Sequence, residues 1–203
     1  MAAIAQASRI DDLPSAPHTR LWTREEYYKM ADTGVLRPGE RVELIGGEII
    51  AMVPQDSPHY TAIDLVEEEL RKIFNAGHVV RVQGPLDLGS TSQPEPDVAV
   101  VTGTIRDYAK AHPTTALLVV EVAESSLAYH RSIKASLYAS ASIPEYWVLN
   151  LVDQRLEVSR DPIAMPGQRY GYGYRTCTYY LAADAVTPLA AEQRSVTVAN
   201  LLP

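Results

Sequence analysis

The chain has 203 residues, 46% hydrophobic and 21% charged, a composition typical of a globular protein and unlike that of a disordered one. Its formal net charge of −7 argues against a protein that holds nucleic acid mainly through a basic surface, but does not exclude an enzyme that contacts nucleic acid around a metal ion. The single cysteine, Cys177, excludes an intrachain disulfide and favours the cytoplasm, and the longest apolar run is too short to predict a membrane span.

The N-terminal part divides into an arm and the start of a domain. Residues 1–20 show no periodicity and are expected to form a flexible arm, followed by a single domain over residues 21–203. Thr23 precedes two glutamates and a short helical pattern that ends near Gly34, which predicts a capped helix.

The next segments predict a mixed α/β domain. Residues 41–54, RVELIGGEIIAMVP, carry two apolar runs around Gly46-Gly47 and predict a β-hairpin. Apolar residues at helical spacing predict a helix from about Pro58 to Asn75. The middle of the chain then predicts three strands, a helix and a strand, at residues 78–88, 95–101, 117–122, 126–141 and 145–151.

The C-terminal region has a tyrosine-rich tract, residues 168–184. Together with residues 153–161 it predicts two or three antiparallel strands at the edge of a mixed sheet. The repeated tyrosines of residues 170–174 are also able to stack nucleic-acid bases, although such a tract is more often an edge hairpin. Because exposed edge strands need covering, we expect a homodimer.

Two carboxylates are candidates for chemistry because of where they lie. Glu121 interrupts a strand that is apolar on both faces, where an unpaired charge is costly. Asp97 opens a second apolar strand directly after Pro96. If the strands are neighbours, the two side chains form an oxygen-rich site suited to Mg²⁺. The alternatives are a structural ion pair for Glu121 and a strand-start cap for Asp97.

Lys134 lies on the predicted helix that follows the Glu121 strand. His130, Lys134 and Tyr138 are four residues apart and form a stripe on that helix. A lysine there is able to reach the strand end and stabilise an anionic transition state. The alternative is a surface lysine whose ammonium group extends to solvent.

These segments together resemble the Uma family of proposed restriction endonucleases, within the PD-(D/E)xK, restriction-endonuclease-like group. The similar segments are TREEYYKM, ERVELIGGEIIAMVP, SPHYTAI, PEPDVAVV, LLVVEVAESS, HRSIKASLYA and IPEYWVLNL, in the family's order and spacing from about Trp22 to Leu151. The resemblance implies a restriction-endonuclease-like core of helix, three strands, helix and strand, preceded by a helix and hairpin and followed by the antiparallel edge extension.

The resemblance also implies roles for individual residues. Asp97 and Glu121 are the expected metal ligands, for Mg²⁺ or alternatively Mn²⁺, and Lys134 is the expected active-site lysine. The usual motif places that lysine two residues after the glutamate, where this chain has Ala123. In this family it lies on the next helix instead, which is the position of Lys134.

Three further residues are candidates for the remaining roles. Glu43 matches the glutamate of the family's hairpin and is the candidate third acidic ligand, with an exposed hairpin carboxylate as the equal alternative. Glu67, on the inner side of its predicted helix, is a rival for that role. His59 matches the family's histidine at a helix start and is a candidate catalytic residue, although a purely structural hydrogen bond is an alternative.

The chain departs from the family at two places. His130 stands where the family usually has an aspartate four residues before the lysine, and residues 124–127, ESSL, replace a frequent Ser-Pro-Ser-Thr. The intact Asp97, Glu121 and Lys134 predict a Mg²⁺-dependent endonuclease that hydrolyses phosphodiester bonds in DNA. The His130 departure and the acidic composition favour the alternative, a non-catalytic interaction protein that keeps the nuclease fold.

Overall fold

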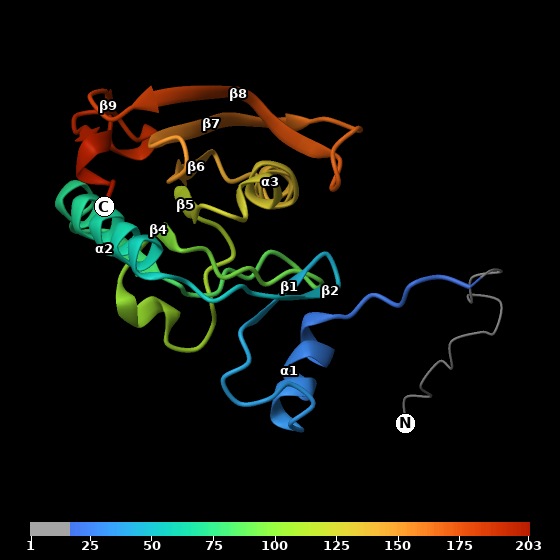
Figure 1. Ribbon diagram of the computed structural model, residues 1–203. Coiled ribbons are helices and arrows are strands. Elements are labelled where there is room, and N and C mark those ends of the chain that lie inside the picture. The colour runs from blue at the N-terminus through green and yellow to red at the C-terminus, as the bar shows by residue number, and fades with distance from the viewer. Residues whose placement is uncertain (1–16) are drawn as a thin grey trace, which may run out of the picture.

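A computed structural model describes residues 17–203, so most of the expected arm, residues 1–20, lies outside the described part of the chain. Its centre is a six-stranded sheet in the order β3-β4-β5-β6-β7-β8 (Figure 1). Strands β5 and β6 are parallel, and every other neighbouring pair is antiparallel. The sheet consists of β3 (His78–Val82), β4 (Val98–Thr102), β5 (Leu118–Ala123), β6 (Glu145–Asn150), β7 (Arg155–Ala164) and β8 (Tyr172–Leu181).

Two small sheets and several helices complete the described fold. The small sheets are the hairpin β1 (Val42–Ile45) with β2 (Glu48–Ala51) and the pair β9 (Ala185–Val186) with β10 (Val196–Thr197). The helices are α1 (Arg24–Asp32), α2 (Ser57–Ile73), α3 (Leu127–Tyr129) and α4 (Ala135–Ser140), with a π-helical turn η3 (His130–Lys134) and 3-10 turns η2 (Ile105–Tyr108), η4 (Leu189–Ala191) and η5 (Val198–Asn200). None of these helices is long and apolar enough to cross a membrane.

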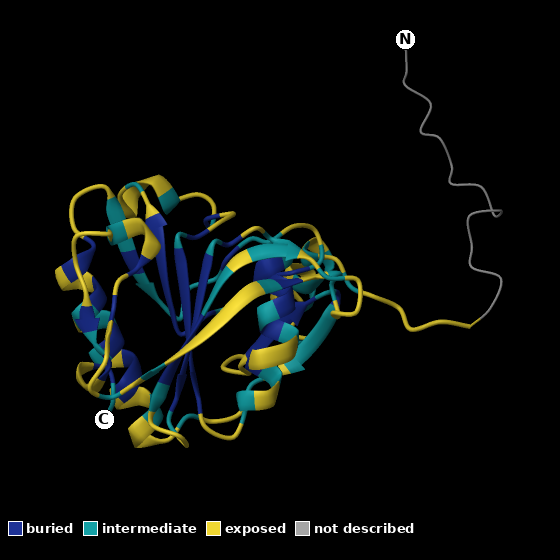
Figure 2. Cartoon of the chain, turned by 90° about the horizontal axis from the view of Figure 1, so that it is seen from above, coloured by how far each residue is buried: buried dark blue, intermediate teal, exposed yellow. Residues whose placement is uncertain are grey.

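The large sheet has a hydrophobic core on each face, which confirms the expected mixed α/β architecture. Strand β5 is buried along its whole length. Leu118, Val120 and Val122 pack with helix α2 and the C-terminal segment on one face. Val119 and Ala123 pack on the other face, beneath the helical segment α3–η3–α4. Figure 2 shows the buried strands running between these two outer layers.

Local sequence signals explain the N-terminal elements. Thr23 and Glu26 form a capping box at the start of α1, as the sequence predicted. In the hairpin, Gly46 and Gly47 have φ of 58° and 82°. A two-residue turn with positive φ at both positions matches the twist of the strands that it joins, and glycine adopts it without strain.

Three predicted elements differ in extent. The strand expected to reach Leu88 ends at Val82, because Gln83 takes a positive φ of 46° that breaks the extended backbone. The strand expected from Glu95 starts at Val98, after Pro96, which has no N–H to donate to a ladder. The single helix expected over residues 126–141 contains the π-helical turn η3 in its middle.

The C-terminal strands form the predicted antiparallel edge. Strands β7 and β8 pair over their length, and β8 is the outermost strand of the sheet. Much of β8 is exposed, including Tyr179 (55%) and Leu181 (62%). The tyrosine-rich tract therefore contains the edge strand β8, which has no neighbouring strand on its outer side among the described residues.

Candidate active site

The two candidate metal ligands lie opposite each other on neighbouring strands. Asp97 immediately precedes β4 and Glu121 lies in β5, and the antiparallel register pairs Val98 with Val120. Continuing that register by one residue places Asp97 against Glu121, so both side chains project from the same face of the sheet. Asp97 and Glu121 thus lie next to each other and face one site, and the expectation that their carboxylates share one cation stays a prediction.

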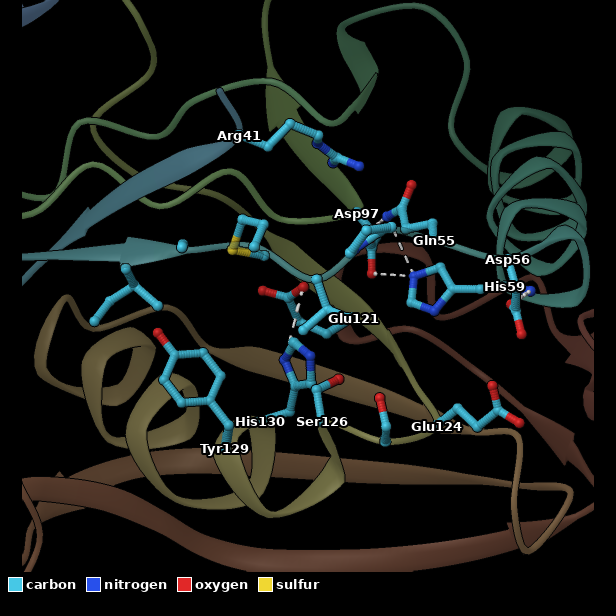
Figure 3. A pocket seen from close by; sticks show the side chains of 16 residues that line it. Arg41, Gln55, Asp56, His59, Asp97, Glu121, Glu124, Ser126, Tyr129 and His130 are labelled. Atoms are coloured by element: carbon cyan, nitrogen blue, oxygen red, sulfur yellow. Dashed lines mark hydrogen bonds and ion pairs between the residues drawn. The ribbon is translucent and has the colours of Figure 1, made fainter. Parts of the chain in front are cut away.

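Both carboxylates line a cavity of about 300 Å³ between the hairpin, the start of α2 and the loop after β5 (Figure 3). Apolar residues of β2 and its following segment form one wall, and polar side chains form the other. The lining residues are Arg41, Ile50, Ala51, Met52, Val53, Pro54, Gln55, Asp56, His59, Asp97, Glu121, Glu124, Ser125, Ser126, Tyr129 and His130.

Asp97 is held in place by donors from three elements. Val122 N–H donates to Oδ2 (2.8 Å) and Gln55 Nε2 donates to Oδ1 (3.2 Å). His59 Nε2 lies 3.6 Å from Oδ2. Burial acts to raise the pKa of Asp97, but His59 and the Val122 N–H outweigh it, so the pKa stays below its usual range. Asp97 is therefore an ionised, oriented carboxylate at neutral pH.

His59 occupies a position that explains both of its possible roles. Its backbone N–H donates to the Asp56 carboxylate that caps α2 (3.1 Å), which is the structural hydrogen bond expected of a helix start. Its imidazole remains directed toward Asp97 and Gln55 at the cavity wall (Figure 3). The structure thus brings His59 into the site, as the sequence indicated.

Glu121 is contacted by the whole stripe on the helical segment. Tyr138 OH donates to Oε1 (2.6 Å), Lys134 Nζ lies 3.1 Å from Oε1, and His130 Nδ1 lies 3.8 Å from Oε2. No hydrogen bond reaches Oε2 from residues 17–203. Burial lowers the pKa of His130, against the attraction of Glu121, which favours a neutral imidazole at pH 7. Tyr138 and Lys134 therefore hold Oε1 of Glu121 in place, and Oε2 remains available to a ligand in the cavity.

Lys134 lies beneath Glu121 and not at the cavity surface. Its ammonium group is fully buried and is shared between Glu121 and Glu43, whose Oε2 lies 2.7 Å away. Burial acts to lower the pKa of Lys134, but the two carboxylates outweigh it, so the pKa is raised and the group is charged. The alternative of a surface lysine is therefore wrong. The lysine reaches the Glu121 strand as expected, but it is a buried cation that does not line the cavity.

Of the two candidates for the third acidic residue, Glu43 joins this network. Its side chain is 1% exposed, binds Lys134 and accepts a hydrogen bond from the Glu95 backbone N–H (2.9 Å). The alternative of an exposed hairpin carboxylate is therefore wrong. Glu67 instead forms an ion pair with Arg71 on the same helix (2.7 Å) and does not line the cavity. Glu43 does not line the cavity, so its link to the site runs through Lys134.

Sequence reasoning missed two residues of the site. Gln55 bridges Asp97 and Gln83, to which its Oε1 is bound at 2.9 Å, and Arg41 lines the cavity from the start of the hairpin. Both lie at the ends of regular elements, where no periodicity assigns a direction to a side chain. The only sequence feature that could have pointed to Gln55 and Arg41 is that each flanks the hairpin that carries Glu43.

The donor set is compatible with a hard divalent cation. Among residues 17–203 no three Asp, Glu, His or Cys side chains are arranged to hold a metal ion. Mg²⁺, however, is commonly bound by one or two carboxylates, with waters and substrate phosphates completing its shell. Asp97 and Oε2 of Glu121, which accepts no hydrogen bond from residues 17–203, supply such a pair. The buried carboxylates, Glu43 included, outnumber the one buried ammonium, so the cavity favours a cation.

Comparisons with known proteins agree with this architecture. A family model named Uma2 and described as "Putative restriction endonuclease" matches residues 24–199. A crystal structure from Anabaena variabilis, titled a "putative nuclease belonging to DUF820", superposes with a TM-score of 0.64 at 13% identity, over 88% of this chain and 96% of that one. At that identity the likeness shows the fold alone. A comparison with curated proteins gave no match.

Proposed function

Since the chain belongs to the Uma2 family, whose model covers residues 24–199, we propose that it is a Mg²⁺-dependent endonuclease that hydrolyses phosphodiester bonds in DNA. The observation that carries the proposal is the pairing of Asp97 with Glu121 across β4 and β5, facing one cavity. An oriented carboxylate pair that faces a cavity is able to hold a divalent cation for metal-assisted hydrolysis.

In this proposal Asp97 and Glu121 hold the cation, and the residues around them keep both carboxylates oriented toward the cavity. A bound Mg²⁺ or Mn²⁺ supplies charge that polarises the scissile phosphate and lowers the pKa of an attacking water. Lys134 and Tyr138 fix Oε1 of Glu121 and leave Oε2 for the cation. Lys134 is thus a positioning residue, and Glu43 keeps it charged and in place.

A second function has one observation in its favour. His130 replaces the family's aspartate, and its buried Nδ1 accepts or donates no hydrogen bond within residues 17–203. A site that lost its catalytic geometry while keeping the fold would serve as an interaction module. The module is also compatible with the acidic net charge of −7. We rank it second, because the carboxylates that the nuclease needs are present and oriented.

Cleavage and metal binding together separate the two functions. Supercoiled plasmid and single-stranded DNA are incubated with Mg²⁺ or Mn²⁺, and each protein is titrated with metal by calorimetry. We expect wild type to cut and Asp97→Asn to lose metal binding and at least a hundredfold of the rate, about 3 kcal/mol. Asp64→Asn, on the exposed side of α2, is the matched control. A wild type that binds no metal and cuts neither substrate would favour the interaction module.

We also propose a homodimer in the cytoplasm. The exposed edge strand β8 supports the dimer, because it has no neighbouring strand on its outer side among the described residues and such an edge favours pairing with a second strand. The lone exposed Cys177 on that strand is compatible with a reducing compartment. Sedimentation velocity at tens of micromolar, a concentration above roughly micromolar dimer affinities, is expected to show a dimer, and a clean monomer would contradict it.

A further inference from the structure

Arg41 lies at the open end of the hairpin, immediately before β1. Its carbonyl accepts a hydrogen bond from Met52 N–H (2.9 Å), which extends the hairpin pairing one residue beyond Val42 and Ala51. Side chains two apart on a strand project from the same face, so Arg41 and Glu43 share a face of the hairpin. Glu43 reaches into the core, and Arg41, roughly 7 Å further along the backbone, reaches the cavity.

The Arg41 guanidinium has no partner that would hold it in a structural role. Within residues 17–203 it makes no hydrogen bond and no ion pair. Its charge does act on Glu95, whose pKa is raised by burial and lowered to a lesser extent by Arg41. Figure 3 shows the guanidinium extending over the cavity on the side of Asp97. A long cationic side chain is thus available at the mouth of a cavity walled by carboxylates.

No second long cationic side chain lines the cavity among the described residues. Among the described residues that line it, Arg41 is the only lysine or arginine. Lys134, the lysine expected to meet the substrate, is enclosed by Glu43, Glu121 and Tyr138. A phosphodiester that enters beside two carboxylates is repelled by them and needs cationic contacts besides a metal ion. The planar guanidinium fork matches two phosphate oxygens at once.

We infer that Arg41 binds a phosphate of the nucleic-acid strand that enters the cavity, and so takes over the substrate contact that Lys134 cannot make. This inference rests on the proposed function, because it takes the phosphodiester as the ligand of the same site. It assigns binding to Arg41 and metal placement to Asp97 and Glu121, so the two assignments are separable by experiment.

The test is the salt dependence of DNA binding. A short fluorescein-labelled DNA strand and its duplex are titrated with wild type, Arg41→Ala, Arg41→Lys and Arg37→Ala at about 50 to 200 mM NaCl. Fluorescence anisotropy reports binding, Ca²⁺ replaces Mg²⁺, and a gel confirms that the probe stays intact. Arg37→Ala is the matched control, because Arg37 is exposed, lies four residues away and does not line the cavity.

We expect Arg41→Ala to weaken binding about tenfold or more and to reduce the slope of log K against log [salt] by about 0.7 to 0.9. Arg41→Lys should keep the slope and restore part of the affinity, because it keeps the charge and loses the fork. Arg37→Ala should change neither quantity.

Three results separate the inference from the proposed function. Equal losses for Arg41→Ala and Arg37→Ala, or no loss for either, would overturn the role of Arg41 while the nuclease proposal stands. Wild type that binds neither probe would overturn both. If wild type binds with the expected Arg41 effects but does not cut DNA with Mg²⁺ or Mn²⁺, the Arg41 contact is supported and the hydrolytic function fails.

Discussion

Two groups of buried carboxylates differ in how their charge is balanced. Glu145, on β6, accepts from Arg160 and Trp147 with Oε1 and from the Leu189 N–H with Oε2, so both of its oxygens are bound. Glu157, on β7, is likewise bound on both oxygens, by Arg131, Arg155 and Asn150.

The cavity group is arranged differently. Glu43 and Glu121 share the single ammonium of Lys134, Asp97 is held by neutral donors and a histidine, and Oε2 of Glu121 accepts no hydrogen bond from the described residues. Burial of a carboxylate therefore does not by itself indicate a functional site. An excess of buried negative charge, with an oxygen left facing a cavity, does indicate one, because a stability role would favour complete pairing.

The largest expected effect is on folding, from loss of the shared cation. Lys134→Met should lower the free energy of unfolding by about 3 to 5 kcal/mol, because Glu43 and Glu121 are left buried without a counter-charge. Urea denaturation measures it, with the exposed Lys72→Met as control, expected within about 0.5 kcal/mol. A small effect of Lys134→Met would show that the carboxylates are protonated or hydrated.

The structural carboxylates should respond strongly as well. Glu145→Gln should cost about 2 kcal/mol of stability, because Arg160 loses a charged acceptor and the packing leaves little room to replace it. Urea denaturation again gives the value. Glu48→Gln, which breaks the exposed pair with Arg169, is the control and should cost less than about 0.5 kcal/mol. Equal losses would mean that burial does not distinguish the two pairs.

The cavity carboxylate should behave in the opposite way. Glu121→Gln should leave the unfolding free energy unchanged or raise it by up to about 1 kcal/mol, because it removes one of the excess negative charges. The same variant should lose its heat of Mg²⁺ and Mn²⁺ binding in calorimetry. If Glu121→Gln instead destabilises as much as Glu145→Gln, the Glu121 carboxylate is a structural group and the contrast fails.

The smallest effects are pH-dependent and of opposite sign. Hydrogen bonds from Arg131 and Asn150 outweigh burial and lower the pKa of Glu157, so its stabilisation is present above the unfolded pKa of about 4.3 and is lost as pH falls through the lower folded pKa. Burial raises the pKa of Glu43, although Lys134 acts to lower it. The ionised form of Glu43 therefore destabilises the folded state at neutral pH.

Denaturation of Glu157→Gln and Glu43→Gln across pH 3 to 8, roughly, tests this contrast. Wild type should be more stable than Glu157→Gln at pH 7, with the difference shrinking below about pH 4. Glu43→Gln should be more stable than wild type at pH 7, with the gain disappearing as pH falls through the raised folded pKa. If both substitutions changed the free energy of unfolding at pH 7 in the same direction, the proposed excess of negative charge around Glu43 would be contradicted.

The sequence predicted the parts of the site that regular structure determines. A single charge in a strand that is apolar on both faces singled out Glu121, and helical spacing placed Lys134 on the face that meets it. Spacing gives the face of a helix but not the depth of its side chains, so the burial of Lys134 was not predictable. Neither was its pairing with Glu43, 91 residues away in the chain, nor the direction of Arg41 at a strand end.

The most direct test of the account is the position of a metal ion in crystals grown with Mn²⁺. Anomalous diffraction locates Mn²⁺ independently of the protein atoms. The account predicts a peak in the cavity, within coordination distance of an Asp97 oxygen and of Glu121 Oε2, and its absence in crystals of Asp97→Asn. A cavity that stays without a peak at millimolar Mn²⁺, or a peak bound only elsewhere on the chain, would contradict the central claim that these two carboxylates share a cation.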